Sequence, residues 1–168
     1  MDDFSIPGAS NYFGYPPSPN NYIEPGKRPL SSMSPTFVVK NGLLYAALGG
    51  SGGSKIPTST CQVLLNVLAH NMDAGTAVGA PRVHDQLLPD LLYVETQYPA
   101  RITSELSQMG YNISQVDVTA VIQLIIRNVT ADGSVTLNAA SDWRKYGEPA
   151  GSDSTNEFSS RPYGISSL

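Results

Sequence analysis

The stretch TFVVKNGLLYAALGGSGGSKIPTST, residues 36–60, carries the local signals that decide the fold. Residues 36–40 are rich in β-branched and apolar side chains, which favour a strand. Asn41-Gly42 follows, and this dipeptide is the strongest short signal for a two-residue hairpin turn. Residues 43–48 are apolar again and predict the returning strand. The stretch therefore predicts a β-hairpin at the centre of the chain.

A glycine-rich loop, residues 49–54, follows the predicted hairpin and leads into a predicted helix. Pro57 and the hydroxyl residues after it are typical of a helix start, and residues 60–72 continue with an apolar stripe at helical spacing. A glycine loop that opens a helix is a common anion site, because the first amides of the helix have no intrahelical partner.

The remaining sequence alternates between short strand and helix patterns. Residues 6–35 are rich in Pro, Gly, Asn, Ser and Tyr and show no period, so we expect a loop, packed through its aromatic residues. Further strands are expected at residues 91–95, 112–118, 120–129 and 134–139, and a further helix at residues 99–109. This order predicts the α+β class, with a sheet of mostly antiparallel strands and helices on one face.

Composition excludes several function classes. The 168 residues are 40% hydrophobic and 14% charged, which is typical of a globular domain. The formal net charge is −4 and no basic run is longer than Lys27-Arg28, so nucleic-acid binding is not expected. The one cysteine allows no internal disulfide. No apolar run approaches the ~20 residues of a membrane span, and no signal-peptide pattern is present.

Two segments could carry chemistry. Residues 27–36 place the hydroxyls of Ser31 and Ser32 beside two cationic side chains, which suits a carboxylate. The glycine loop offers backbone amides that a ligand can approach closely, which suits a developing oxyanion. On their own, such serine pairs and glycine pairs are more often turn or cap residues than binding sites.

Four segments together resemble the γ-glutamyltransferase family, also called γ-glutamyl transpeptidase or glutathione hydrolase. They are residues 1–5, MDDFS; residues 25–36, PGKRPLSSMSPT; residues 52–54, GGS; and residues 80–82, APR. Residues 1–147 are similar to the C-terminal part of the small subunit of that family. Residues 152–168 match nothing in it, and we expect residues 148–168 to form a disordered tail.

The resemblance implies the αββα sandwich of the N-terminal-nucleophile hydrolases, of which this chain would encode a partial set of strands and helices. It also implies an activity: a threonine attacks a γ-glutamyl amide, and the resulting ester passes the glutamyl group to water or to an acceptor amino acid or peptide. Glutathione and other γ-glutamyl compounds would be the substrates. The large subunit of the same precursor would be the partner, and no cofactor is implied.

The family motif transfers roles to five residues. Asp3 resembles the carboxylate that accepts the α-ammonium group of the substrate, a charge-assisted hydrogen bond. Ser31 and Ser32 resemble the hydroxyl pair that holds the α-carboxylate. Gly52 and Gly53 resemble the oxyanion hole, where one donor contributes ~3 kcal/mol to lowering the barrier.

The two histidines do not add a metal centre to this set. His70 and His84 have no partners at the spacing of metal ligands, so we expect no metal site. His84 is interpreted as a structural hydrogen-bonding residue.

The catalytic threonine of the family precedes the segment that matches residues 1–5. We therefore expect no nucleophile in this chain, and no turnover by the chain alone. By resemblance the parent enzyme is extracellular or membrane-associated and passes through the secretory pathway. The tripeptides that begin at Asn112 and Asn128 are glycosylation sequons, which matter only in that compartment.

Two alternatives remain open from the sequence. A related amidase such as a cephalosporin acylase is disfavoured by Asp3 and the serine pair, which suit an α-amino acid head. A catalytically inactive γ-glutamyl-binding or interaction module derived from the family would keep the pocket without the nucleophile.

Overall fold

The computed structural model describes residues 2–151 of the chain. In chain order the elements are η1 (Pro19–Asn21), β1 (Thr36–Lys40), β2 (Leu43–Ser51), η2 (Gly53–Lys55), α1 (Ile56–Leu68), α2 (Ala74–Gly79), β3 (Val83–His84), β4 (Leu92–Glu95), α3 (Ala100–Gln108), β5 (Ile113–Val116), β6 (Val121–Val129), β7 (Val135–Ala140) and η3 (Trp143–Lys145), where η marks a 3-10 helix. Residues 152–168, most of the predicted tail, lie outside the described residues.

The main sheet is antiparallel throughout, with the strand order β1-β2-β6-β7. β1 and β2 form the predicted hairpin, and the turn residues Asn41 and Gly42 both have positive φ, 54° and 78°. Positive φ at both central residues is the mark of the type I′ turn, whose twist matches that of the strands. The central hairpin is therefore confirmed.

The glycine-rich segment differs from its prediction as a loop of six residues. β2 continues to Ser51, and its last three residues pair with β6. A side chain at Gly50 would place its Cβ 2.3 Å from the carbonyl oxygen of Val121, so only glycine lets the two strands approach this closely. Between the end of the paired strand β2 and the 3-10 helix η2, only Gly52 remains irregular.

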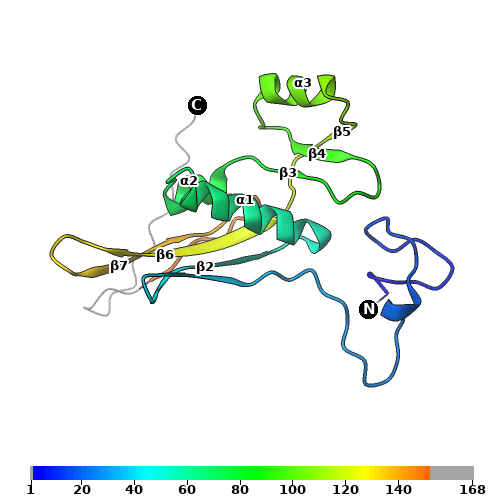
Figure 1. Cartoon of the computed structure of the whole chain (residues 1–168), viewed down its shortest axis with the longest axis horizontal. Helices are drawn as coiled ribbons and strands as arrows, with labels where there is room; N and C mark the ends of the chain where they lie inside the picture. The colour runs from blue at the N-terminus through cyan, green and yellow to red at the C-terminus, as the bar shows by residue number, and fades with distance from the viewer. Residues whose placement is uncertain (1, 152–168) are drawn as a thin grey trace.

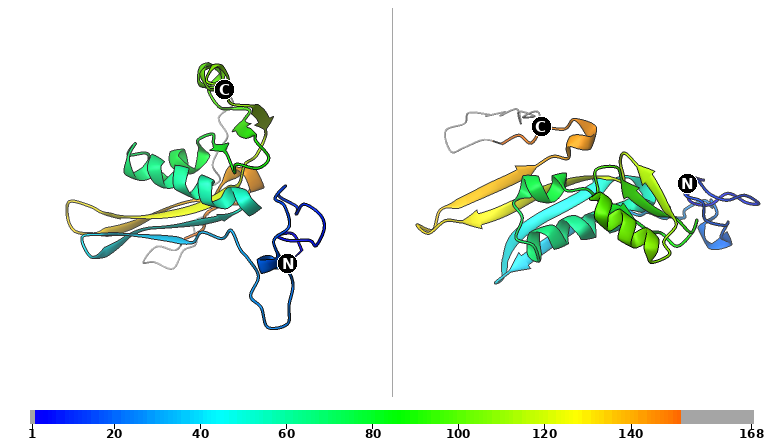
Figure 2. Two further views of the ribbon diagram at one scale, coloured as in Figure 1. Left: turned by 45° about the vertical axis from the view of Figure 1, so that its right-hand side comes forward. Right: turned by 90° about the horizontal axis from the view of Figure 1, so that it is seen from above.

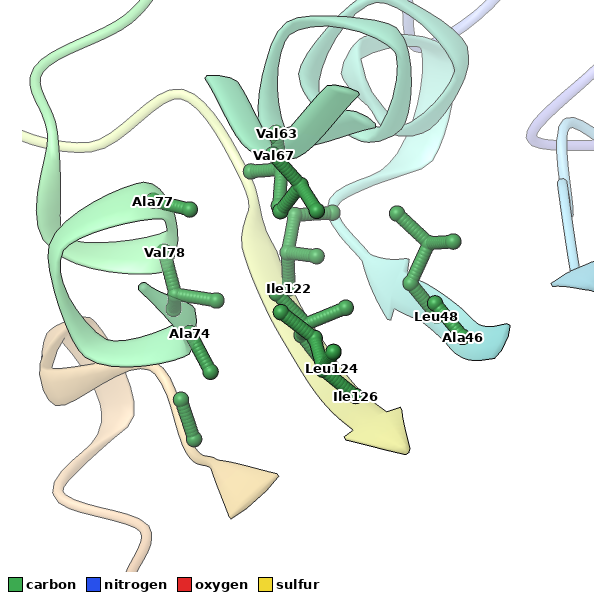
Figure 3. Close-up of a cluster of buried hydrophobic side chains, with 11 residues drawn as sticks. Ala46, Leu48, Val63, Val67, Ala74, Ala77, Val78, Ile122, Leu124 and Ile126 are labelled. Atoms are coloured by element: carbon green, nitrogen blue, oxygen red, sulfur yellow. The ribbon is translucent and has the colours of Figure 1, made fainter. Parts of the chain in front are cut away.

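The core lies between the main sheet and two helices. α1 and α2 cover one face of the sheet in Figure 1, and Figure 3 shows their side chains meeting those of β2 and β6. The buried members are Ala46, Leu48, Val63, Val67, Ala74, Ala77, Val78, Ile122, Leu124, Ile126 and Ala140. Small residues on α2 let this short helix sit close to the sheet.

The helix boundaries correct two expectations. α1 begins at Ile56, beside the helix start predicted at Pro57, but it ends at Leu68 rather than at residue 72, and the chain turns after it through Asn71 at φ 54°. α2 was not expected at all. Its N-cap Asp73 accepts a hydrogen bond from the Thr76 amide at 3.0 Å, a signal that the two following glycines obscured.

A second, smaller sheet departs from the single sheet that was expected. It has the order β3-β4-β5, and β4 and β5 are parallel, connected through α3. The strands β4, β5, β6 and β7 and the helix α3 lie within two residues of their predicted bounds, whereas β3, only two residues long, gave no periodic signal. The α+β class itself is confirmed.

The other face of the main sheet is apolar and exposed. Phe37 is 71% exposed, Leu137 67% and Ile125 45%, and all three alternate with residues of the core face. Within residues 2–151, the main sheet has a layer of helices on one face, which agrees with the expectation of a partial αββα sandwich. Residues 2–35 form an irregular loop, and both views in Figure 2 place it at one end of the main sheet.

Candidate functional site

A cavity of about 630 Å³ brings together residues from four parts of the chain. Its lining residues are Asp3, Tyr12, Phe13, Gly52, Gly53, Ser54, Lys55, Gln86, Tyr93 and Thr119. Three of the five residues predicted from the sequence, Asp3, Gly52 and Gly53, therefore share one cavity. Cavities of similar size on the open sheet face and beside α2 contain none of the five.

Gly52 and Gly53 are held in conformations that other residues rarely adopt, with φ of 146° and 62°. A Cβ on Gly52 would lie 2.6 Å from the Cβ of Ala120, and a Cβ on Gly53 would lie 2.4 Å from Cε1 of Phe13. The glycine pair is therefore enclosed by the start of β6 on one side and by the N-terminal loop on the other.

The carbonyl groups of the glycine pair are engaged, whereas the amides are free. The Gly52 carbonyl accepts from the Lys55 amide at 3.3 Å, and the Gly53 carbonyl accepts from the Ile56 amide. Within residues 2–151, the amides of Gly52 and Gly53 donate to no other group. Two adjacent N–H groups beside a cavity can donate to an oxyanion.

The serine pair lies next to this loop but is not part of the cavity wall. Ser32 Oγ donates to the Gly53 carbonyl at 2.6 Å, which links the serine segment to the glycine pair. Ser31 is exposed, and its Oγ accepts from the Met33 amide at 3.1 Å. The structure thus joins Ser32 to the glycine pair and leaves Ser31 at the surface.

Asp3 belongs to the N-terminal loop, which is held together by one side chain that the sequence analysis did not identify. Asn11 is 9% exposed; its Nδ2 donates to the Phe4 carbonyl at 2.7 Å, and its Oδ1 accepts from the amides of Phe13 and Tyr15 at 3.0 Å. The Asp3 carboxylate makes no ion pair within residues 2–151. It is exposed at the cavity and available to a cation.

Gln86 connects the N-terminal loop to the glycine segment. Its Nε2 donates to the Phe13 carbonyl at 2.6 Å, while its Oε1 accepts from Ser54 Oγ at 2.7 Å. The same Oε1 lies 2.9 Å from His84 Nε2. Gln86 thereby fixes the distance between the two segments that line the cavity.

His84 is buried, and its hydrogen bond to Gln86 helps to hold Gln86 in place. Burial lowers its pKa, so the imidazole is neutral at pH 7. Because Gln86 Oε1 can only accept, the ring proton is assigned to Nε2, and Nδ1 accepts from Thr58 Oγ1 at 2.7 Å. The structure agrees with the interpretation of His84 as a structural hydrogen-bonding residue.

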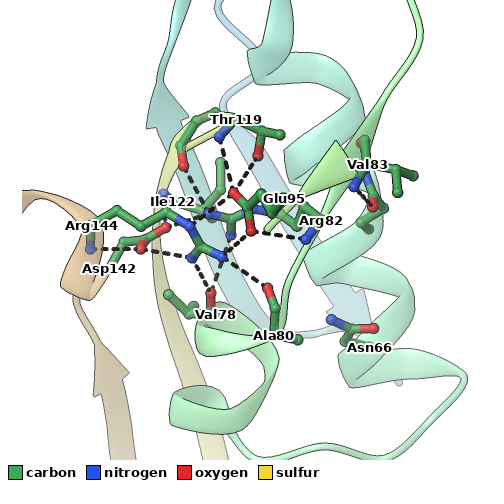
Figure 4. A network of polar contacts seen from close by, with 12 residues as sticks. Asn66, Val78, Ala80, Arg82, Val83, Glu95, Thr119, Ile122, Asp142 and Arg144 are labelled. Carbon is green, nitrogen blue, oxygen red and sulfur yellow. Dashed lines mark hydrogen bonds and ion pairs between the residues drawn. The ribbon is translucent and has the colours of Figure 1, made fainter. Parts of the chain in front are cut away.

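A buried ionic network that was not predicted is shown in Figure 4, and it contacts Ala120, the neighbour of Gly52. Arg82 pairs with Asp142 at 2.7 Å, Arg144 pairs with Glu95 at 2.5 Å, and Arg144 also reaches Asp142 at 3.0 Å. These four side chains are at most 1% exposed. Two arginines and two carboxylates balance in charge, which is the condition for burying them.

The network fixes the position of the backbone that encloses Gly52. Arg82 Nη2 donates to the Ala120 carbonyl at 2.7 Å, and Glu95 Oε1 accepts from the amide and the hydroxyl of Thr119 at 3.0 and 2.9 Å. Ala120 is the residue that contacts Gly52. The turn before β6 is therefore held by charged hydrogen bonds, which are stronger than neutral ones.

The two carboxylates of this network remain ionised. Burial of Glu95 opposes ionisation, but hydrogen bonds from Arg144 and Thr119 outweigh burial and hold its pKa below the ordinary value. Asp142 behaves in the same way through the Ile122 amide and Arg82, so its pKa is also lowered. The network consequently stays charged at neutral pH.

Residues 2–151 contain no group of three or more His, Cys, Asp and Glu side chains arranged to hold a metal ion. Across the same residues, no helix combines the length and the apolar surface that crossing a membrane requires. The groups that line the candidate site include the Asp3 carboxylate, the Lys55 ammonium group, the Gln86 amide and several hydroxyls, beside the backbone of Gly52 and Gly53.

The family model described as gamma-glutamyltranspeptidase matches residues 1–152 of this chain. A glutathione hydrolase proenzyme of Arthroderma benhamiae is 42% identical over 128 residues, covering 76% of this chain and 22% of that protein. Glutathione hydrolase 2 of Arabidopsis thaliana is 42% identical over 164 residues, covering 90% of this chain and 28% of that protein. The chain thus spans about a quarter of the length of these relatives.

The fold is also similar to solved structures. A mutant of Helicobacter pylori gamma-glutamyltranspeptidase superposes with a TM-score of 0.79 at 42% identity, covering 86% of this chain and 78% of that one. This likeness confirms the N-terminal-nucleophile hydrolase fold that the sequence implied.

Proposed function

The chain belongs to the gamma-glutamyltranspeptidase family, and from this premise we propose that it forms the pocket of a γ-glutamyltransferase and glutathione hydrolase. The observation that carries the proposal is the single cavity that joins Asp3 to the free amides of Gly52 and Gly53. A carboxylate and two aligned N–H donors are complementary to the two ends of a γ-glutamyl group, its ammonium and its scissile carbonyl.

In this pocket Asp3 accepts hydrogen bonds from the α-ammonium group of the substrate. Its lack of an ion pair within residues 2–151 supports this role, because the carboxylate has no competing cation to displace. The amides of Gly52 and Gly53 donate to the carbonyl oxygen as it gains negative charge. The enclosed glycine geometry supports this second role, since preorganised donors need no rearrangement during the reaction.

Ser31 and Ser32 bind the α-carboxylate of the same substrate. A serine hydroxyl has one proton, and Ser32 gives that proton to the Gly53 carbonyl. When a carboxylate binds at Ser32, the Ser32 hydroxyl donates to the carboxylate instead of to the Gly53 carbonyl. Within the described residues, Ser31 makes no hydrogen bond to the glycine segment, so it loses none when it binds the carboxylate. The serine segment in this way links occupancy of the head-group site to the glycine pair.

The nucleophile and the large subunit complete the site in the precursor. The Arthroderma benhamiae relative is named as a proenzyme, and this chain spans 22% of it, which supports an assembly with other parts of a longer protein. We place the large subunit against the open face of the main sheet, which exposes Phe37, Ile125 and Leu137. Acceptors are water, amino acids or peptides.

We propose that the parent enzyme passes through the secretory pathway. Asn112 is exposed on the loop before β5, so its sequon is accessible to a glycosyltransferase, whereas Asn128 is half-buried within β6. Secretion from a eukaryotic host followed by peptide mass mapping is expected to find a glycan at Asn112. An unmodified Asn112 in secreted protein contradicts this placement.

The decisive experiment compares γ-glutamyl and glutaryl anilides with the complete gene product that carries this chain. The two substrates differ only in the α-amino group, so we expect turnover of the γ-glutamyl anilide and little of the glutaryl one. Asp3→Asn is expected to raise KM for the γ-glutamyl substrate ten- to a hundredfold, the effect of losing a charged hydrogen bond. Asp117→Asn, at an exposed residue outside the cavity, is the matched control.

Each alternative predicts a different result in this assay. An acylase turns over the glutaryl anilide at least as well and is insensitive to Asp3→Asn. An inactive module binds γ-glutamyl compounds without turnover. The latter is less well supported, because the two relatives described above are named as hydrolases.

A further inference from the structure

Lys55 lines the same cavity as Asp3 and the glycine pair, at the end of η2. Its side chain is half-buried, and its Nζ lies 5.0 Å from the centroid of the Tyr93 ring. Tyr93 in turn stacks on the buried His84 with ring centroids 6.0 Å apart. The aromatic ring holds the ammonium group at a defined place in the cavity wall.

The Lys55 ammonium group has no anionic partner. Within residues 2–151 it makes no ion pair, and its Nζ donates no hydrogen bond. Lys55 is also the only lysine or arginine among the described residues that line this cavity. The cavity therefore presents one unpaired anion, Asp3, and one unpaired cation, with the free amides of Gly52 and Gly53 beside both.

A cavity of this composition fits a ligand with a cationic end and an anionic end. If the proposed function holds, Asp3 takes the ammonium group and the glycine amides take the scissile carbonyl. In glutathione the part beyond that carbonyl is cysteinylglycine, two residues that end in a carboxylate. The two residues of cysteinylglycine span at most about 7 Å. Lys55 follows Gly53 by two residues in a 3-10 turn that rises about 2 Å per residue, so the backbone of Lys55 lies within that span of Gly53.

From these observations we propose that Lys55 binds the terminal carboxylate of the peptide that leaves from, or accepts, the γ-glutamyl group. The inference rests on the proposed function and adds a residue that selects the leaving group and the acceptor. Because transfer to an acceptor peptide is the reverse of its departure, one site serves both steps. Lys55 thus favours peptides with a free terminal carboxylate over amides of the same length.

The test uses the complete gene product and two donors, glutathione and glutathione whose glycine carboxylate is replaced by a carboxamide. The measured quantity is the ratio of KM for the amide to KM for the acid. We expect a ratio of about ten for the wild type and about one for Lys55→Gln, because the variant removes a single charge-assisted hydrogen bond. Lys55→Arg is expected to restore most of the ratio, and Lys55→Glu to invert it.

Lys40→Gln is the matched control. Lys40 also lies over a tyrosine ring, with its Nζ 5.4 Å from the centroid of Tyr45, but it sits on β1 outside the cavity. This variant is expected to keep the wild-type ratio. Circular dichroism of every variant establishes that it is folded.

The outcomes separate the inference from the proposed function. A wild type that turns over neither peptide contradicts both. A wild type that turns over both peptides, with a ratio that Lys55→Gln and Lys55→Glu leave unchanged, overturns only the inference. A Lys55→Gln variant in which both KM values rise equally also overturns it, because Lys55 then binds the glutamyl head group instead.

Discussion

The glycine pair of the candidate site is enclosed by two regions of very different construction. Behind it, the ionic network of Arg82, Glu95, Asp142 and Arg144 is buried and pairs charge with charge. In front of it, the N-terminal loop has no regular strand or α-helix and depends on hydrogen bonds from two amides, Asn11 and Gln86. One wall is fixed by electrostatics in the interior, and the other by a few neutral contacts near the surface.

This difference indicates how the two walls divide their roles. A buried, hydrogen-bonded network in which every charge has at least one ion-pair partner holds the proposed oxyanion donors in one geometry. A loop held by neutral hydrogen bonds opens at much lower free energy, as loops that border binding sites commonly do. The proposed ammonium ligand Asp3 therefore lies on the wall that moves more easily.

The largest expected effect comes from removing one charge of the network. Arg144→Met leaves the buried Glu95 carboxylate without its ion-pair partner, so the free energy of unfolding should fall by about 3–5 kcal/mol. Urea unfolding monitored by circular dichroism measures the loss. Glu105→Gln, which breaks an exposed helical pair with Arg101, should cost no more than about 0.5 kcal/mol. If the free energy of unfolding falls equally in the two variants, the buried network stabilises the protein no more than an exposed ion pair does.

The next largest effect is expected from acidic pH, which should reduce the stability that the ionic network contributes. The pKa values of Glu95 and Asp142 are lowered in the folded protein from ordinary values of 4.5 and 3.8. Their contribution to stability is therefore complete above those ordinary values and is lost as pH falls through the lowered ones. Urea midpoints measured between pH 6 and pH 2 should decline in the acidic range. Arg144→Met should flatten this decline, and an unchanged slope would argue against Glu95 as its source.

The contact between the two walls is probed by Gly53→Ala. Both Gly53 and the remote Gly26 have positive φ, 62° and 76°, so alanine at either costs about 1–2 kcal/mol of backbone strain. Only at Gly53 would the new Cβ also press on Phe13, whereas nothing lies within 4 Å at Gly26. Gly53→Ala should therefore cost about 1 kcal/mol more than Gly26→Ala and should displace the N-terminal loop. Equal costs would show that Phe13 does not pack on the glycine pair.

The smallest effect on global stability is expected from a substitution in the N-terminal loop. Asn11→Ala removes three side-chain hydrogen bonds within the N-terminal loop, but the loop opens without the main sheet, so the global cost should stay below about 1 kcal/mol. Amide hydrogen exchange should instead show faster exchange at Phe13 and Tyr15. Asn20→Ala, at an exposed position in the same loop, should leave both rates unchanged. A large global loss would place the loop in the same cooperative unit as the sheet.

Much of the fold followed from local patterns. The Asn41-Gly42 turn, the strands around it and the later strands each have signals within a few residues. The end of β2 did not, because it includes Gly49 and Gly50, whose strand conformation comes from pairing with β6 rather than from their own preference. α2 was hidden because six residues with two glycines have little intrinsic helical preference, and its stability comes from packing on β6 and β7.

The residues of the candidate site were predicted only through the resemblance to the γ-glutamyltransferase family. Asp3 and the glycine pair are some fifty residues apart, and nothing local indicates that they share a cavity. The ionic network could not be predicted from the sequence for the same reason. Arg82 and Asp142 are 60 residues apart, and single arginines and aspartates give no periodic signal. Gln86 and Asn11 could be recognised only as turn residues until their partners were known.

The order of the ionic network along the chain also sets the order in which it can be completed during synthesis. Arg82 and Glu95 leave the ribosome first, and Asp142 and Arg144 follow about fifty residues later. Until Arg144 emerges, Glu95 cannot enter the interior without an uncompensated charge, so the turn at Thr119 and Ala120 stays unset while β6 is already available. A nascent chain therefore acquires the enclosed geometry of its glycine pair only after residues 142–144 have been synthesised.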